Sequence, residues 1–149
     1  MDKHAMVVRS GQSQELRVMG AQVRFLCEAQ DTGKAWSLME VQLPKDSGPP
    51  PHMHDWDEAY YVSEGEVRFF LAGDTHTVRA GDFVYAPGGT LHGFSGVSES
   101  PARLLIYDAP AHAGAFFREV DREVKELPRD LAKVGAIGER HGIHFAPPA

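Results

Sequence analysis

The sequence predicts an all-β domain followed by C-terminal helices. Between residues 5 and 108, short apolar or alternating runs are separated by turns rich in glycine, proline and aspartate, which is typical of antiparallel β proteins. Helical periodicity begins only after Pro110. At 149 residues the chain is about one domain long. We therefore expect a single domain over 1–149, with a β-barrel core over about 20–108 and a helical tail over about 111–142.

Ten stretches of the first part fit β-strands, because each is short and apolar or alternating, and is bounded by turn residues. Glycine-containing turns separate several of them, as at 64–65 and 72–74. The proline run at 49–51 cannot donate ladder hydrogen bonds, so it should form an extended approach to the first histidine of the next segment. The predicted strands are 6–9, 15–19, 23–28, 35–43, 58–63, 66–72, 75–79, 83–86, 92–95 and 102–108.

Two helices are expected in the tail. Phe116, Val120, Val124 and Leu127 recur at three-and-four spacing, which predicts an amphipathic helix over 113–127 that ends at Pro128. Residues 129–141 form a weaker helical stretch that is closed by Gly142. Both helices should pack on the outside or at one mouth of the β domain.

Composition excludes several classes of partner. The chain has 15 basic and 21 acidic residues, and its formal charge of −6 disfavours binding to nucleic acid or to anionic lipid. Cys27 is the only cysteine, so neither an internal disulfide nor a thiolate-rich metal site can form. The chain start lacks the apolar core of a signal peptide, and no run approaches the length of a membrane span. We expect a cytoplasmic protein in a reducing compartment.

The histidines and a glutamate of one short segment predict a metal site. His52, His54 and Glu58 stand at positions i, i+2 and i+6, so all three side chains share one face of an extended strand. A later strand supplies His92. This set suits a divalent transition metal such as Fe, Mn, Ni, Co or Zn. The alternative is a hydrogen-bonded histidine cluster without metal. Asp57 would point to the opposite face and is not expected to bind.

The other chemically active residues have structural explanations. By the same alternation Trp56 should face away from the metal, as a packing residue, an exposed loop aromatic or a pocket lid. Cys27 is expected to be a small buried thiol on the face of Val23 and Phe25, with a place near the metal as the alternative. Phe25, Tyr60, Phe69 and Phe94 should belong to the barrel core, and any of them that border the metal would favour a flat phenolic or enolic substrate. The remaining histidines are expected to be solvated or satisfied structurally: His4, His76, His112, His141 and His144.

Two motifs resemble those of the cupin superfamily. The first is His52-x-His54-x₃-Glu58-x₆-Gly65, and the second is Gly81-x₅-Pro87-x-Gly89-x₂-His92. Two turn positions depart from the family pattern, with Asp46 in place of a glycine and Gly96 in place of an asparagine. The wider run over 50–92 and the tail around Phe116 are most similar to bacterial cupins described as quercetin dioxygenase-like.

The resemblance implies a double-stranded β-helix, a small jelly-roll barrel with the metal inside. Its ligands would be His52, His54, Glu58 and His92. Four protein ligands leave two adjacent positions of a six-coordinate metal for a small-molecule substrate, or for a substrate together with O₂. The resemblance thus implies a dioxygenase acting on a small aromatic or enolic, flavonol-like substrate, with Glu58 serving also as the catalytic base.

Two other functions stay open from the sequence. One is a metal-dependent isomerase, decarboxylase or lyase that acts on a small hydroxy or keto acid. Such an anionic substrate needs a cationic side chain in the pocket, for which the candidates on predicted strands are Arg24, Arg68, Arg79 and Arg103. The other is a non-catalytic small-molecule-binding barrel. Single-domain cupins commonly form homodimers, and the predicted strands within 6–19 would allow this by edge addition.

Overall fold

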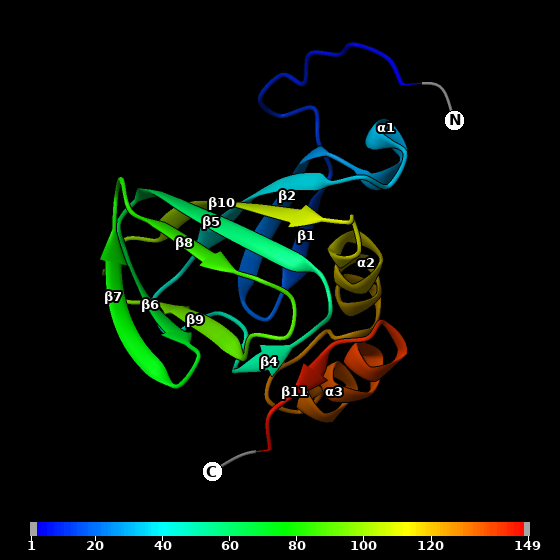
Figure 1. Ribbon diagram of the computed structural model, residues 1–149. Helices are drawn as coiled ribbons and strands as arrows, with labels where there is room; N and C mark the ends of the chain where they lie inside the picture. Colours follow the sequence, from blue (N-terminus) through cyan, green and yellow to red (C-terminus); the bar gives the residue numbers. More distant parts are fainter. Residues whose placement is uncertain (1–2, 148–149) are drawn as a thin grey trace.

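Two antiparallel β-sheets face each other in the computed structural model, which describes residues 3–147 (Figure 1). One sheet has the strand order β1-β2-β3-β10-β5-β8, and the other has the order β11-β4-β9-β6-β7. The strands are β1 (Glu15–Val18), β2 (Ala21–Cys27), β3 (Ser37–Leu43), β4 (His52–Met53), β5 (Asp57–Glu64), β6 (Glu66–Leu71), β7 (Asp74–Arg79), β8 (Phe83–Ala86), β9 (His92–Gly96), β10 (Ala102–Ala109) and β11 (His144–Phe145). The helices are α1 (Ala29–Thr32), α2 (Ala113–Glu123) and α3 (Leu131–Arg140).

Strands that are distant in the sequence are neighbours in both sheets. β10 lies between β3 and β5, and β9 lies between β4 and β6. This crossing connectivity is that of a jelly roll. It confirms the predicted fold class, an all-β jelly-roll barrel with C-terminal helices.

The core lies between the two sheets, where the strands alternate buried and solvent-facing side chains. On β3, Met39, Val41 and Leu43 are fully buried, and the residues between them are partly exposed. The opposite sheet contributes Val67 and Phe69, which are also fully buried. Because burying a side chain of this kind stabilises a fold by about 1.5–3 kcal/mol, the alternation fixes which face of each strand points inward.

The C-terminal tail covers one end of the barrel (Figure 1). The carboxylate of Asp108 accepts the backbone N–H groups of His112 and Ala113 at the start of α2. Phe116 and Val120 are buried on the inner face of this helix, as the spacing predicted. No helix within residues 3–147 combines the length and the apolar character that crossing a membrane requires.

Helix α2 ends at Glu123, four residues before the predicted end, so the assignment of its end to Pro128 was wrong. The cause is Asp130, whose Oδ2 accepts the backbone N–H groups of Lys125 and Glu126 at 3.0 and 3.1 Å. Those N–H groups are therefore not available to helix carbonyls. Leu127 is 45% exposed as a result.

Three other elements differ from the prediction. Residues 6–9 are exposed and form no strand, because the sheet ends at β1, whose one partner is β2. Residues 29–32 form the short helix α1, which a reciprocal capping box between Glu28 and Asp31 stabilises. β11 was not predicted, because two residues are too short to show a sequence period.

The two departures from the cupin motifs lie against each other. Asp46 adopts the left-handed conformation (φ 62°) that glycine would otherwise supply, and its N–H donates to the carbonyl of Gly96 at 2.9 Å. A Cβ at position 96 would lie 2.4 Å from the carbonyl oxygen of Pro44, so only glycine fits there. The family pattern has glycine at the first of these positions and asparagine at the second, whereas this chain has its glycine at the second. The two positions contact each other, and this contact holds the loop that leads to His52.

Candidate metal centre

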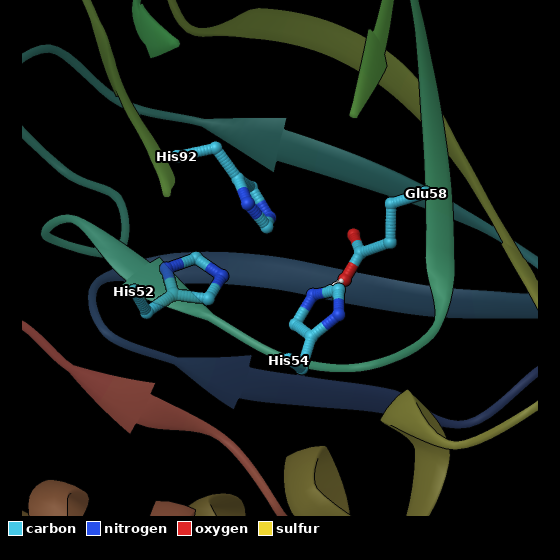
Figure 2. Close-up of side chains that lie close together, drawn as sticks. All are labelled: His52, His54, Glu58 and His92. Carbon is cyan, nitrogen blue, oxygen red and sulfur yellow. Dashed lines mark ion pairs between the residues drawn. The ribbon is translucent and has the colours of Figure 1, made fainter. Parts of the chain in front are cut away.

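Four buried side chains converge between the two sheets (Figure 2). His52 comes from β4, His54 from the segment that follows it, Glu58 from β5 and His92 from β9. One nitrogen or oxygen from each lies within 4.8 Å of the others. All four are at most 8% exposed, so the group has the size and the burial of a metal-ion site.

Sheet pairing and a bend in the chain create this convergence. His52 and His92 are register partners across β4 and β9, whereas Glu58 pairs with Ala86 and Asp108 in the other sheet. The segment 52–58 is not one continuous strand, because it bends at Asp55 and Trp56 before β5 begins. The single-strand interpretation was therefore wrong in its geometry, although the side chains it selected do meet.

Hydrogen bonds to backbone carbonyls orient the three imidazoles. Nδ1 of His52, His54 and His92 donates to the carbonyls of Pro50, Trp56 and Thr90 at 2.9, 3.0 and 2.8 Å respectively. Each Nε2 then carries a lone pair directed into the site, as in metal-bound histidines. The Nε2 atoms of His54 and His92 are buried and have no hydrogen-bond partner. Because buried polar atoms are normally satisfied, a cation at this point fits the donor set.

The carboxylate of Glu58 completes the set. Its Oε2 accepts the hydroxyl of Tyr60 at 2.7 Å, and its Oε1 lies 2.5 Å from Nε2 of His54. Since the proton of His54 is on Nδ1, these two atoms are lone-pair donors that face each other. A metal ion coordinated by both would replace repulsion with attraction.

The electrostatics favour the protonation states that a metal needs. Burial, and next the neighbouring His92, lower the pKa of His52 to about 4, and burial lowers the pKa of His92. Burial raises the pKa of Glu58, but at low pH, where the imidazoles are protonated, a hydrogen bond from His54 and the charges of the three histidines outweigh this effect and bring the pKa to about 2. Burial and the Glu58 carboxylate raise the pKa of Tyr60. At neutral pH the site therefore presents neutral imidazoles at His52 and His92 and an ionised carboxylate at Glu58.

An apolar cavity adjoins the candidate metal centre. Its volume, measured as the space open to the centre of a water molecule, is about 40 Å³. Within residues 3–147, the polar side chains of its wall are those of His52, Glu58 and Tyr60. Aliphatic and aromatic side chains form the rest of the wall, among them Val41 and Phe94. Phe94 thus borders the site, as the sequence left open, whereas Phe69 stays in the core.

None of the four candidate arginines lines this cavity. Arg24 pairs with Glu40 at 3.2 Å, and Arg79 and Arg103 also lie near surface carboxylates. Arg68 is on the solvent-facing side of β6. The cationic pocket that a small acid substrate requires is therefore not formed by these residues.

The structure corrects the prediction for Cys27 and shows where Asp57 lies. The register shifts between Phe25 and Cys27, so the two do not share a face, and Cys27 is half-buried outside the cavity wall. Burial, and next Asp31, raise the pKa of its thiol. Asp57 is exposed, and its carboxylate accepts the N–H of Gly88 in the loop before His92.

The predicted orientation of Trp56, facing away from the metal, was wrong. It is 5% exposed, and its indole stacks on the imidazole of His54 instead of facing away. The chain bend at this position breaks the alternation from which its orientation was predicted. Exposed His112 stacks on the other side of the indole, with centroids 4.7 Å apart.

The remaining histidines do not join the cluster. His141 contacts Glu119, and His144 contacts Glu139. His4 and His76 are exposed. Sequence reasoning missed the role of Tyr60 as a hydrogen-bond donor to Glu58. Tyr60 follows Glu58 by two residues on one strand, so the sequence could have predicted that the two side chains share a face.

Comparisons with known proteins agree with the fold. Residues 39–107 match the family described as "Cupin domain". The polyketide synthase CurC of Streptomyces cyaneus is 27% identical over 92 residues, which are 61% of this chain and 60% of that protein. The match therefore spans less than two thirds of this relative.

Solved structures give the same result for the fold. The polyketide cyclase RemF from Streptomyces resistomycificus is 25% identical, with a TM-score of 0.64 over 71% of this chain and 80% of that one. A predicted oxalate decarboxylase from Thermotoga maritima is also 25% identical, with a TM-score of 0.63 over 70% of this chain and 99% of that one. KdgF from Halomonas sp., at 20% identity and a TM-score of 0.65 over 72% and 94% of the two chains, shares the fold.

Proposed function

We propose that this chain, which has a cupin domain at 39–107 and the cupin fold, is a metal-dependent enzyme for an uncharged, flat, enolic or phenolic substrate. The observation that carries the proposal is the cavity beside the metal centre. Its wall is apolar and aromatic, and its polar side chains are two of the candidate ligands and Tyr60. Such a wall favours an aromatic molecule and offers no counter-charge to a small carboxylic acid.

In this proposal His52, His54, Glu58 and His92 hold one divalent metal, which is Fe, Mn, Ni, Co or Zn. The metal would supply Lewis-acid chemistry that lowers the pKa of an enolic or phenolic hydroxyl. The Nδ1 hydrogen bonds keep the three imidazoles in the binding tautomer without further rearrangement.

Glu58 is the proposed catalytic base. Its Oε1 faces the imidazole nitrogens, while Tyr60 binds its Oε2. A carboxylate held in this way accepts the hydroxyl proton of the substrate at Oε1. Tyr60 keeps the carboxylate in one rotamer and stabilises its charge within an apolar wall.

Two reactions can follow removal of that proton. In ring closure of a poly-β-ketone chain, the enolate carbon adds to a ketone carbonyl carbon, the π bond of that carbonyl breaks, and the new alkoxide takes back the proton from Glu58, so no oxidant is needed. The similarity to CurC and RemF, which are described as a polyketide synthase and a polyketide cyclase, favours ring closure. The second reaction is addition of O₂ to a flavonol-like substrate. The likeness of the motif region to quercetin dioxygenase-like cupins favours it. We place ring closure first, because the relatives named above support its substrate class.

Three measurements test the proposal. The first is the metal content of protein purified without added metal. The second is deuterium exchange at the acidic carbon of benzoylacetone, a neutral aromatic β-diketone, followed by NMR. The third is O₂ uptake with quercetin. Exchange without O₂ uptake supports the cyclase, whereas O₂ uptake supports the dioxygenase.

The matched variants are His54→Ala and His76→Ala, which remove a candidate ligand and an exposed histidine respectively. Activity should be lost in the first variant and kept in the second. Activity that persists in His54→Ala would show that the reaction occurs elsewhere. Binding of benzoylacetone with neither exchange nor O₂ uptake would favour a non-catalytic binder.

A further inference from the structure

The cavity beside the metal centre has walls of two different origins. The barrel supplies one part, including Val41 and Phe94. The C-terminal tail supplies the other part, which includes Phe116 and Phe117 from α2, Ile143, and Phe145 from β11. The tail therefore closes a space that the barrel alone would leave open at that end (Figure 1).

The cavity is too small for an organic ligand of ordinary size. By the measure used for its 40 Å³, one water occupies about 10–15 Å³, so the cavity holds about three waters. Pockets that enclose drug-sized molecules are roughly 300–1,000 Å³. An aromatic ligand can therefore reach the metal centre only if part of the wall moves.

Helix α2 is firmly attached to the barrel. Asp108 caps its first turn, and the backbone N–H of Arg17 on β1 donates to Asp121 at 2.8 Å. Its inner residues Phe116 and Val120 are fully buried. This part of the wall is not a good candidate for movement, because opening it would expose core side chains.

Strand β11 is held much more weakly. It has two residues, and its partner β4 also has two. The pairing joins His144 to Met53 and Phe145 to His52, and Ala146 adds one hydrogen bond to Pro51. β11 is also the outermost strand of its sheet, so its other edge pairs with no strand in the described part of the chain. Few hydrogen bonds must break for it to separate.

The side chain of Phe145 occupies the place where such movement would open the cavity. Its ring lies 5.5 Å from the ring of His52 and 6.4 Å from that of Phe116, between centroids. Gly142, with φ 76°, precedes β11 and connects it to α3. Because Ile143 is buried and its N–H donates to the carbonyl of Gly138 at 2.8 Å, the rotation that moves Phe145 away from His52 would occur after Ile143, which leaves α2 and Ile143 in place.

We propose that β11 is the gate of the cavity and that Phe145 is its plug. Release of the β4–β11 pairing admits an apolar aromatic ligand, and renewed pairing encloses it against His52. This inference requires neither a bound metal nor the proposed reaction, since it concerns only entry into the cavity.

A reversible disulfide between β4 and β11 tests the gate. Met53 and His144 are register partners, both are exposed, and neither lines the cavity, so Met53→Cys with His144→Cys can join the strands from outside. Cys27→Ala removes the only native cysteine. The control pair is Arg68→Cys with Thr77→Cys, which are exposed register partners on β6 and β7.

The probe is N-phenyl-1-naphthylamine, a neutral aromatic dye that fluoresces in apolar sites, mixed with metal-free protein. We expect the oxidised Met53–His144 pair to slow dye entry at least tenfold, and reduction to restore the rate. The control pair should show no such difference. Phe145→Ala, which removes the plug and keeps the backbone pairing, should speed entry about tenfold.

Two results would overturn the gate. One is a rate of dye entry that neither the Met53–His144 disulfide nor Phe145→Ala changes. The other is no dye binding at all by the reduced protein, which would mean that the wall does not open. Because the protein is metal-free throughout, either result leaves the proposed reaction to be judged by its own assays.

Discussion

The indole of Trp56 lies flat on the imidazole of His54, with ring centroids 4.0 Å apart and an interplanar angle of 7°. The carbonyl of Trp56 also accepts the Nδ1–H of that imidazole at 3.0 Å. One residue thus fixes both the plane and the tautomer of a candidate metal ligand. This contact makes Trp56 a built-in reporter of the site.

Metal binding should quench the fluorescence of Trp56. We expect Co²⁺ to reduce the emission of a Trp36→Phe variant, in which Trp56 is the one remaining tryptophan, because a paramagnetic ion at His54 lies next to the stacked indole. The same titration of the variant that also carries His54→Ala should show little quenching. Equal quenching in both variants would place the ion elsewhere.

Tyr60→Phe should weaken metal binding and leave the fold intact. The change removes the hydrogen bond to Oε2 of Glu58, and loss of a partner of this kind typically lowers metal affinity about 10- to 100-fold. Competition with a chromophoric chelator measures the affinity. Tyr61→Phe is the matched control, because Tyr61 is 46% exposed on the opposite face of β5 and should have no effect.

Two glycines of α3 should respond in opposite ways to alanine. A Cβ on Gly138 would lie 2.8 Å from the carbonyl oxygen of Ile143 and 2.9 Å from the ring of Phe145, so Gly138→Ala should lower the free energy of unfolding by about 1–3 kcal/mol. A Cβ on Gly135 meets nothing within 4 Å. Gly135→Ala should therefore raise that free energy by about 0.5–1 kcal/mol, through helix propensity. Urea denaturation of both variants is the measurement, and equal effects would contradict the packing of Phe145 against α3.

The metal-free protein should lose stability as the pH falls from 6.5 to 4. Burial lowers the pKa of His52 from 6.5 to about 4, so in this interval the unfolded chain binds a proton that the folded chain does not. The loss begins near the unfolded pKa and is complete below the folded one, and it amounts to about 3 kcal/mol for this shift.

Urea midpoints of metal-free protein across this pH range measure the effect. His52→Gln should flatten the dependence, although His92, whose pKa is also lowered, keeps part of it. His76→Gln, at an exposed position, should leave the slope unchanged. A slope that is the same in His52→Gln and in the unsubstituted protein would refute the assignment.

A homodimer remains a prediction, and the structure offers a surface for it. Tyr61, Phe83, Tyr85 and Tyr107 project from the outer face of β5, β8 and β10, where they are 46%, 64%, 50% and 40% exposed. The register places Tyr61 beside Phe83, and Ala59 between Tyr85 and Tyr107. With about half of each ring exposed, the four aromatic side chains present on the order of 400 Å² of apolar surface, which is the size of the largest, often functional, patch on a typical monomer.

We expect a second copy of the chain to cover this surface. The positions that form it carry no charge, and Asp57 borders it only beside Tyr85, so two copies can meet there although the chain has a net charge of −6. Light scattering should give the mass of a dimer, and Phe83→Glu should give that of a monomer. Val7→Glu, on the N-terminal segment first expected to mediate pairing, should stay dimeric. A monomeric unsubstituted protein would remove the prediction.

Much of the fold could be predicted because alternation is a local property. Met39, Val41 and Leu43 alternate with polar residues, and their strand is found where it was expected. The end of α2 could not be predicted in this way. It depends on Asp130, which contacts the N–H groups of Lys125 and Glu126 only after the following turn has formed.

The sequence by itself determined the identity of the four clustered residues and the all-β class, because both follow from spacing and residue type along short segments. The jelly-roll topology was implied by the resemblance of the two motifs to those of cupins. Tertiary structure decided which further side chains act on the cluster. Trp56 turned toward His54 because the chain bends there, and Phe145 reached His52 because a two-residue strand found a partner more than 90 positions earlier. Spacing encodes the direction of side chains on one strand, whereas contacts between distant segments depend on register and bends, which no local pattern specifies.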